Sequence, residues 1–316
     1  MSLWDLIERP LPTTPEETKR FEVEGPWNWG DPVHETMTRL ALNKAGVVDW
    51  NLESTDPKVF EYLRGVFWND DPEALLFNDS GSSTSRFSTG LQFAIAFKAA
   101  ETESKNRFHQ KGAVLTARSH FGDLQFLHAM ATRDGQDPVQ TLASVMGWAR
   151  FAWEVSTGKI GAEATMEALP DESVRDLFDD KPKRTVKELF NCGKAGIVRR
   201  RALGSLLHMV QDSYASGHVE REELADERKG RVRCFYSYAG QDHAKHAADD
   251  GWRQGATDLQ KIASIKGGRD ALEQCTVLAK LYVDNAPWAE VEAHLRGTVF
   301  SLSPELRVSG PGSAFE

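Results

Sequence analysis

The sequence predicts a mostly α-helical protein, all-α in class and built as a single multi-helix domain. Apolar residues recur at helical spacing through most of the chain between residues 33 and 295. Strand signals are scarce, and the best of them, over 231–238, is short. No internal repeat appears, and 316 residues suffice for one large domain. We therefore expect an N-terminal arm or pro-segment over 1–28, a helical domain over 29–300 and a tail over 301–316.

The individual elements follow from local composition and periodicity. Residues 1–28 are rich in Pro and Glu and show little periodicity. The polar, Ser-rich stretch 78–90 predicts a loop of the kind that often flanks an active site, and residues 309–316 are expected to be disordered. Helical spacing indicates helices over 33–46, 57–67, 91–106, 138–156, 162–168, 184–190, 194–214, 240–263, 269–284 and 287–295.

Composition and net charge limit the classes of function that this protein can have. Hydrophobic residues make up 40% of the chain and charged residues 27%, and no apolar run approaches the roughly 18 residues of a membrane span. The formal net charge of -9 does not attract the nucleic-acid backbone over long range. Cys192, Cys234 and Cys275 show no C-x-x-C spacing. They indicate neither a disulfide scaffold nor a cysteine zinc site, so we expect any metal on histidine and carboxylate.

The stretch from His208 to His218 is the most informative part of the chain. His208 and Asp212 are four residues apart, which places both side chains on one face of a helix, where they can share a metal ion. If the helix continued, His218 would lie about 15 Å further along its axis, too far to share that ion. A second His-x3-Asp pair, His246 and Asp250, follows downstream. The pattern predicts a site for more than one metal ion.

These residues resemble the ligand core of the zinc-dependent phospholipase C family, whose fold also serves the zinc single-strand nucleases. Trp29-Gly-Asp-Pro-Val-His34 is similar to the start of the mature enzymes, and Trp68-Asn-Asp70 to their aromatic-x-Asp ligand. Ser119-His120-Phe121 is similar to the Ser-His-Phe of the bacterial phospholipases. The order of the matching residues extends from residue 29 to residue 250.

The resemblance implies three zinc ions, or two if one position stays empty. The implied ligands are Asp70, His120, His208 and Asp212 for the first ion, His218, His246 and Asp250 for the second, and His34 with the bridging Asp212 for the third. Asp71 is an alternative to Asp70, His109 and His128 are rivals of His120, and His243 is a rival of His246. Trp29 is internal here, whereas the family uses an N-terminal Trp, so Asp31 and Glu35 are further candidates for the third ion.

The resemblance also implies a function, namely phospholipase C activity, with phosphatidylcholine as the expected substrate. A zinc-bound hydroxide would attack the phosphodiester and release diacylglycerol. Asp212 would bridge two ions, and Asp70 would serve as ligand and base. Trp68, Phe121 and Tyr214 are candidates for a choline-binding pocket, with core packing as the alternative for each.

The expected surroundings of such an enzyme follow from the same resemblance. Its partner would be a phospholipid membrane surface or micelle, and it would act as a monomer. The family is secreted or periplasmic in bacteria, although no signal peptide is visible in this chain. Two alternatives stay open: a single-strand-specific zinc nuclease, and a non-catalytic zinc-stabilised helical protein.

Overall fold

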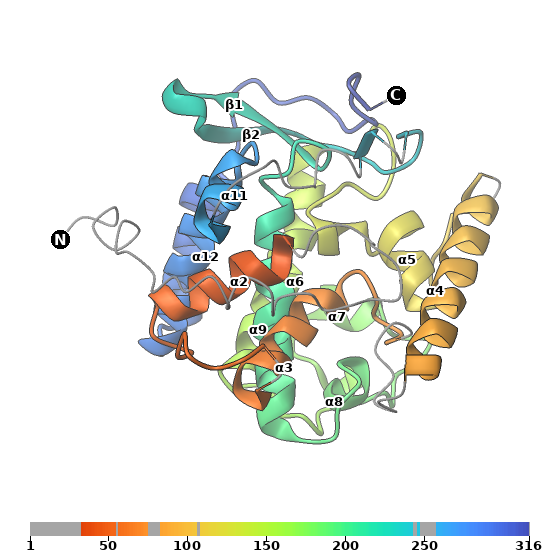
Figure 1. Cartoon of the computed structure of the whole chain (residues 1–316). Coiled ribbons are helices and arrows are strands. Elements are labelled where there is room, and N and C mark those ends of the chain that lie inside the picture. Colours follow the sequence, from red (N-terminus) through yellow and green to blue (C-terminus); the bar gives the residue numbers. More distant parts are fainter. Residues whose placement is uncertain are drawn as a thin grey trace.

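The computed structural model describes residues 33–54, 56–74, 83–105, 108–242, 245–246 and 257–315. The fold is mostly helical, as predicted (Figure 1). The expected arm over 1–28, together with Trp29, Asp31, His243 and Asp250, lies outside the described residues. The helices are α2 (Val33–Lys44), α3 (Pro57–Trp68), α4 (Ser83–Ser104), α5 (Leu115–Phe121), α6 (Pro138–Ser156), α7 (Glu172–Asp176), α8 (Val186–Leu189), α9 (Ala195–Asp212), α11 (Asp258–Ser264), α12 (Gly268–Val283) and α13 (Trp288–His294).

Helix α9 forms the centre of the molecule. It contacts α2, α3, α6 and α12, and nearly every residue of its second half is buried. The core around it draws side chains from Val33 to Phe300 into one cluster. Trp68 of α3 stacks on Trp148 of α6 with ring centroids 5.4 Å apart. Because α9 is enclosed by other helices, the polar groups at its C-terminal end are held in a fixed, largely water-free setting.

Two glycines allow α3 and α9 to pack backbone to backbone. A Cβ atom on Gly204 of α9 would lie 2.3 Å from the carbonyl oxygen of Tyr62. One on Gly65 of α3 would lie 2.2 Å from the carbonyl oxygen of Arg201. Any side chain at either position would force the helices apart, so glycine is required for this approach. The contact places the residues that follow α3 directly beside the last turns of α9.

Helices α3 and α6 begin with the same local signal. Asp56 and Asp137 are the N-caps, and their carboxylates accept hydrogen bonds from the backbone N–H groups of Lys58 and Val139. A proline follows each cap at the first helical position. This combination satisfies a free N–H and presets the backbone angle, which is why the predicted starts at 57 and 138 match the structure.

Several expected elements differ from the structure. Helix α4 begins at Ser83, so the loop predicted over 78–90 is wrong from that residue onward, and residues 75–82 lie outside the description. A helix expected over 162–168 is reduced to a single 3-10 turn, Met166–Ala168. The short helices α5 and α7 were not predicted, because seven or five residues are too few to show a period.

A two-stranded antiparallel sheet follows α9. It pairs β1 (Val219–Glu223) with β2 (Lys229–Phe235), in the region where a strand was predicted. Residues 301–307 then run along β2, where the N–H of Val232 donates to the carbonyl of Ser301. Ser309 and Phe315 are buried, so the expectation of disorder over 309–315 is wrong. In the part of the chain that the structure describes, no helix is long and apolar enough to cross a bilayer.

Candidate metal centre

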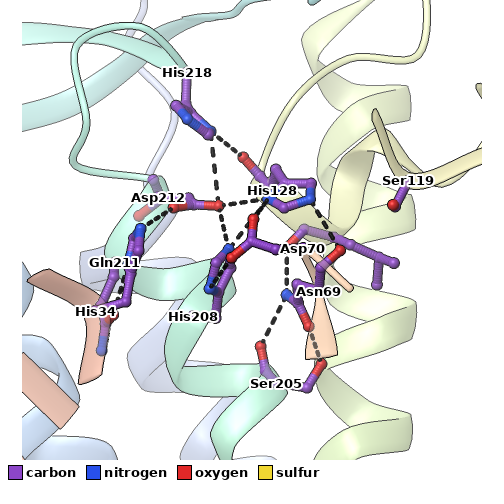
Figure 2. Close-up of polar contacts among 12 residues, drawn as sticks. His34, Asn69, Asp70, Ser119, His128, Ser205, His208, Gln211, Asp212 and His218 are labelled. Atoms are coloured by element: carbon purple, nitrogen blue, oxygen red, sulfur yellow. Dashed lines mark hydrogen bonds and ion pairs between the residues drawn. The ribbon is translucent and has the colours of Figure 1, made fainter. Parts of the chain in front are cut away.

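His208 and Asp212 form the base of a histidine–carboxylate cluster at the end of α9 (Figure 2). Nε2 of His208 lies 2.9 Å from Oδ2 of Asp212, as the helical spacing predicted. The helix stops at Asp212, and a turn over residues 213–218 brings the chain back. Nδ1 of His218 therefore lies 3.8 Å from Oδ2 of Asp212. The separation of about 15 Å applied only to a helix that continued to residue 218, and α9 ends before it.

Asp70 joins the cluster from the end of α3. Its carboxylate oxygens lie 3.9 Å from Nδ1 of His208 and 3.9 Å from Nδ1 of His128. The neighbouring Asn69 anchors this turn, since its side-chain amide donates to the carbonyls of Leu127 and Ser205 (Figure 2). Because Asn69 is fully buried and bonded to segments on both sides, the position of Asp70 is set by the fold.

Asp71 does not belong to the cluster. Its side chain is buried and lines a small cavity with Arg64, Trp68 and Asn191. Between the two alternatives that the sequence left open, only Asp70 reaches the histidines.

His120 and His128 both approach Asp70, although only His120 was expected to do so. Nε2 of His120 lies 4.0 Å from Oδ1 of Asp70. His128 lies deeper, with its Nδ1 2.9 Å from Oδ2 of Asp212 and 3.1 Å from Nε2 of His208. The other rival of His120, His109, bonds through Nε2 to the carbonyl of Ala100 and takes no part.

His128 is the residue of the centre that sequence reasoning ranked too low. It ends a 3-10 turn, Gln125–His128, which is followed by Ala129 in the left-handed region at φ 52°. Such a conformation is uncommon for alanine and has no sequence signature. The one available signal was the presence of a second histidine close after His120.

The remaining expected residues are His34, His246, Glu35 and Asp250. Nε2 of His34 lies 3.4 Å from Oδ1 of Asp212, and the imidazole ring of His246 lies 4.7 Å from that of His218, centroid to centroid. Glu35 is part of neither metal-binding group that the described residues form. Those two groups are His34 with His208 and Asp212, and Asp70 with His120 and His128.

Four of these imidazoles share one hydrogen-bonding pattern. Each has Nδ1 next to an oxygen that can only accept, so Nδ1 carries the proton and Nε2 carries the lone pair. The pairs are His34 with Gln211 Oε1 at 2.8 Å, His120 with Thr116 O at 3.0 Å, His218 with His128 O at 2.8 Å and His246 with Gln241 Oε1 at 2.8 Å. An imidazole held in this way by its other nitrogen is the usual state of a metal ligand.

The nitrogen and oxygen atoms in the middle of the cluster offer more lone pairs than there are N–H protons to bond to them. Nε2 of His128 faces the carbonyl of Asn69 at 3.2 Å, which leaves its Nδ1 as a lone pair. That atom, Nε2 of His208 and Oδ2 of Asp212 lie within 3.1 Å of one another. Nδ1 of His208 is buried without a hydrogen-bond partner. A cation would satisfy such a group of donors, so the residues fit a metal ion.

The pKa shifts in the cluster favour the protonation states that bind a metal ion, namely neutral histidine and ionised aspartate. Burial lowers the pKa of His120 to about 4 and also lowers the pKa of His208, so both imidazoles are neutral at pH 7. Burial by itself would raise the pKa of Asp212, but the imidazoles of His208, His218 and His34 outweigh it and hold this pKa well below its usual range. Neutral imidazoles and an ionised carboxylate need no proton release before they bind a cation.

This protonation pattern predicts how the stability of the metal-free protein depends on pH. Unfolding returns His120 to a pKa near 6.5, whereas its pKa in the folded protein is about 4. The unfolded state therefore binds more protons in that window, and stability falls as the pH drops from 6.5 toward 4, by roughly 3 kcal/mol. Urea unfolding with a chelator present, across this window, measures the fall. A His120→Gln variant should show a shallower fall; an equally steep one would contradict the assignment.

The three aromatic residues proposed for a choline pocket have different positions. Trp68 is buried in the core, where its Nε1–H donates to the carbonyl of Leu189. The ring of Tyr214 is covered by the guanidinium of Arg221, 4.0 Å from its centroid. Both rings are packed in the core, which favours the core alternative for these two residues. Phe121 lies beside His120 but is buried.

The fold and the centre together define a mostly helical protein with a buried histidine–carboxylate cluster able to hold metal ions. No family model matches the sequence, and comparison with curated proteins and with solved structures finds no significant match.

Proposed function

We propose that this protein is a zinc-dependent phosphodiesterase of the phospholipase C type, with the fold that this family shares with the zinc single-strand nucleases. One observation carries the proposal. Imidazoles and carboxylates from separate segments of the chain gather around Asp212 and Asp70, and His246 adjoins this group through the ring of His218. The converging residues are His34, Asp70, His120, His128, His208, Asp212, His218 and His246.

The donor set favours zinc and suggests where each ion would bind. Imidazole nitrogen and carboxylate oxygen are ordinary zinc ligands, and no cysteine belongs to either metal-binding group of the described residues. One ion would be held by Asp70, His120 and His128. A second would be held by His34, His208 and Asp212. His218 and His246 would contribute to a further position, to which the resemblance adds Asp250.

The chain's own groups support hydrolysis of a phosphodiester. Zinc, when bound, supplies positive charge at the phosphate oxygens and lowers the pKa of a water ligand to about 7. Both oxygens of Asp212 face imidazoles, Oδ1 toward His34 and Oδ2 toward His208 and His128, so this carboxylate is placed to bridge two positions. Asp70 is the more exposed carboxylate, at 35%, and is therefore the one placed to accept a proton from water.

The expected substrate is a phospholipid, and phosphatidylcholine is the first candidate. The acidic chain gives no long-range attraction to nucleic acid, which favours a phospholipid over a polynucleotide. The resemblance of Ser119-His120-Phe121 to the Ser-His-Phe of the bacterial phospholipases supports the same choice. Two or three zinc ions outweigh the charge of two carboxylates and would leave the centre positive toward a phosphodiester.

The test uses the zinc-loaded full chain on phosphatidylcholine vesicles and, separately, on single-stranded DNA. We expect release of phosphocholine, its loss on chelation and its return when zinc is restored. Nucleotide release without phosphocholine would replace the proposal by the nuclease alternative. No product from either substrate, with zinc bound, would leave a non-catalytic zinc-stabilised protein. Asp212→Asn serves as the inactive control in both assays.

A further inference from the structure

Residues 309–315, here called the C-terminal strap, are fastened to the molecule next to the metal centre. Ser309 anchors the strap, because its Oγ accepts from the N–H of Gln136 at 2.8 Å and its carbonyl accepts from the N–H of Gly135 at 2.9 Å. The carbonyl of Gly310 then accepts from the N–H of Ser237 at 3.0 Å. The strap is thus tied both to residues 135–136 and to Ser237, just before the loop that leads to His246.

Gln241 connects the strap to His246. Its side-chain nitrogen lies 2.8 Å from the carbonyl of Gly217 and 2.7 Å from the carbonyl of Pro311 in the strap. Carbonyls only accept hydrogen bonds, so this atom must be the NH2 group, and the amide oxygen must face His246. That oxygen lies 2.8 Å from Nδ1 of His246. The proton of the imidazole is therefore on Nδ1, and the lone pair is on Nε2.

Phe315 closes the strap over the same histidine. Its ring meets the ring of His246 edge to face, with centroids 6.4 Å apart, and its carbonyl accepts from the N–H of Asp242. Only 7% of Phe315 is exposed. A Cβ atom on Gly217 would lie 2.9 Å from Nδ1 of His246 and 3.4 Å from Cε1 of Phe315, so the three groups are closely packed. The imidazole has little freedom to turn.

We propose that Gln241 and the strap are the positioning elements of one metal position: they hold His246 in the Nδ1–H tautomer so that its Nε2 is available to the ion. The proposal rests on the proposed function, in which His218 and His246 contribute to a further metal position, and goes beyond it because it assigns a role to residues that do not touch the ion. A hydrogen bond to the second nitrogen of a ligand histidine fixes both its tautomer and its orientation.

The test compares Gln241→Leu, Gln241→Glu and Phe315→Ala with the unaltered full chain. Val308→Ala is the matched control, since Val308 lies just before the strap and is 62% exposed. The first readout is NMR of isotope-labelled histidine in the zinc-free protein at mildly alkaline pH, which reports the tautomer of His246. The second is zinc stoichiometry and affinity by competition with a chromophoric chelator.

We expect the unaltered chain, Val308→Ala and Gln241→Glu to keep the Nδ1–H tautomer, because glutamate still offers an oxygen that accepts from Nδ1. Gln241→Glu should nevertheless loosen the strap, because a carboxylate cannot donate to the carbonyls of Gly217 and Pro311. Gln241→Leu should populate the other tautomer and weaken one zinc position by roughly 10- to 100-fold, with the other positions unchanged. Phe315→Ala should weaken the same position. An unchanged tautomer and unchanged zinc affinity in folded Gln241→Leu would overturn the proposal.

These measurements distinguish a failure of the strap proposal from a failure of the proposed function. The tautomer is read without zinc and without substrate. If the protein cleaves no phospholipid but Gln241→Leu still changes the tautomer and weakens one zinc position, the role of the strap stands and the proposed activity fails. If phosphocholine is released and Gln241→Leu changes nothing, the activity stands and the strap has no positioning role.

Discussion

Asp212→Asn should remove bound zinc and phosphodiesterase activity together, and we expect this to be the largest effect of any substitution at the centre. Both carboxylate oxygens face imidazoles, at 3.4 Å from His34 and 2.9 Å from His208. Asparagine removes the negative charge and replaces one ligand oxygen by an NH2 group, which donates and cannot bind a cation. Since supporting residues around metal sites already change affinity by roughly 10- to 100-fold, loss of a bridging ligand should reduce activity by at least about 100-fold.

The measurement is metal content by elemental analysis alongside phosphocholine release. Glu154→Gln is the matched control, because Glu154 is also a buried carboxylate but pairs with Lys159 and Arg150 away from the centre. That control should lose stability and keep its zinc. Full zinc content and full rate in Asp212→Asn would refute the assignment of this residue as a bridging ligand.

Gly204→Ala should destabilise the fold strongly, although it adds only one methyl group. The new Cβ atom would lie 2.3 Å from the carbonyl oxygen of Tyr62 and 2.6 Å from the backbone nitrogen of Val66. Backbone cannot move aside as a side chain can, so α3 and α9 must separate. We expect a loss of about 3 kcal/mol in the free energy of unfolding. The separation should also displace Asp70 from His208 and lower zinc affinity.

Gly196→Ala in the same helix is the control for this substitution. Nothing lies within 4 Å of a Cβ atom at Gly196, and the residue is exposed. Alanine there should change stability by less than about 1 kcal/mol, in the stabilising direction, because alanine is the better helix former. Urea unfolding of both variants measures the difference. Equal stabilities would mean that the two helices are not in backbone contact.

Much of the centre was accessible from the sequence because its motif is local. The spacing of His208 and Asp212 implies a shared face on any helix, whatever the rest of the chain does. His34, Asp70 and His120 were found through their resemblance to a family pattern, and the structure brings all three to Asp212 or to one another. His128 has neither kind of signal, since its approach to Asp212 spans 84 positions along the chain.

The helical class, the starts of α3 and α6 and the paired donors of α9 could all be predicted from the amino-acid sequence, because periodicity and capping act over a few residues. Tertiary structure decided that Asp70 and not Asp71 faces the histidines, that the turn after α9 returns His218 to Asp212, and that the C-terminal strap packs against His246. The physical reason is that these choices depend on contacts between segments far apart in the chain. A packed core and shared hydrogen bonds set such contacts, and no short stretch of sequence encodes them.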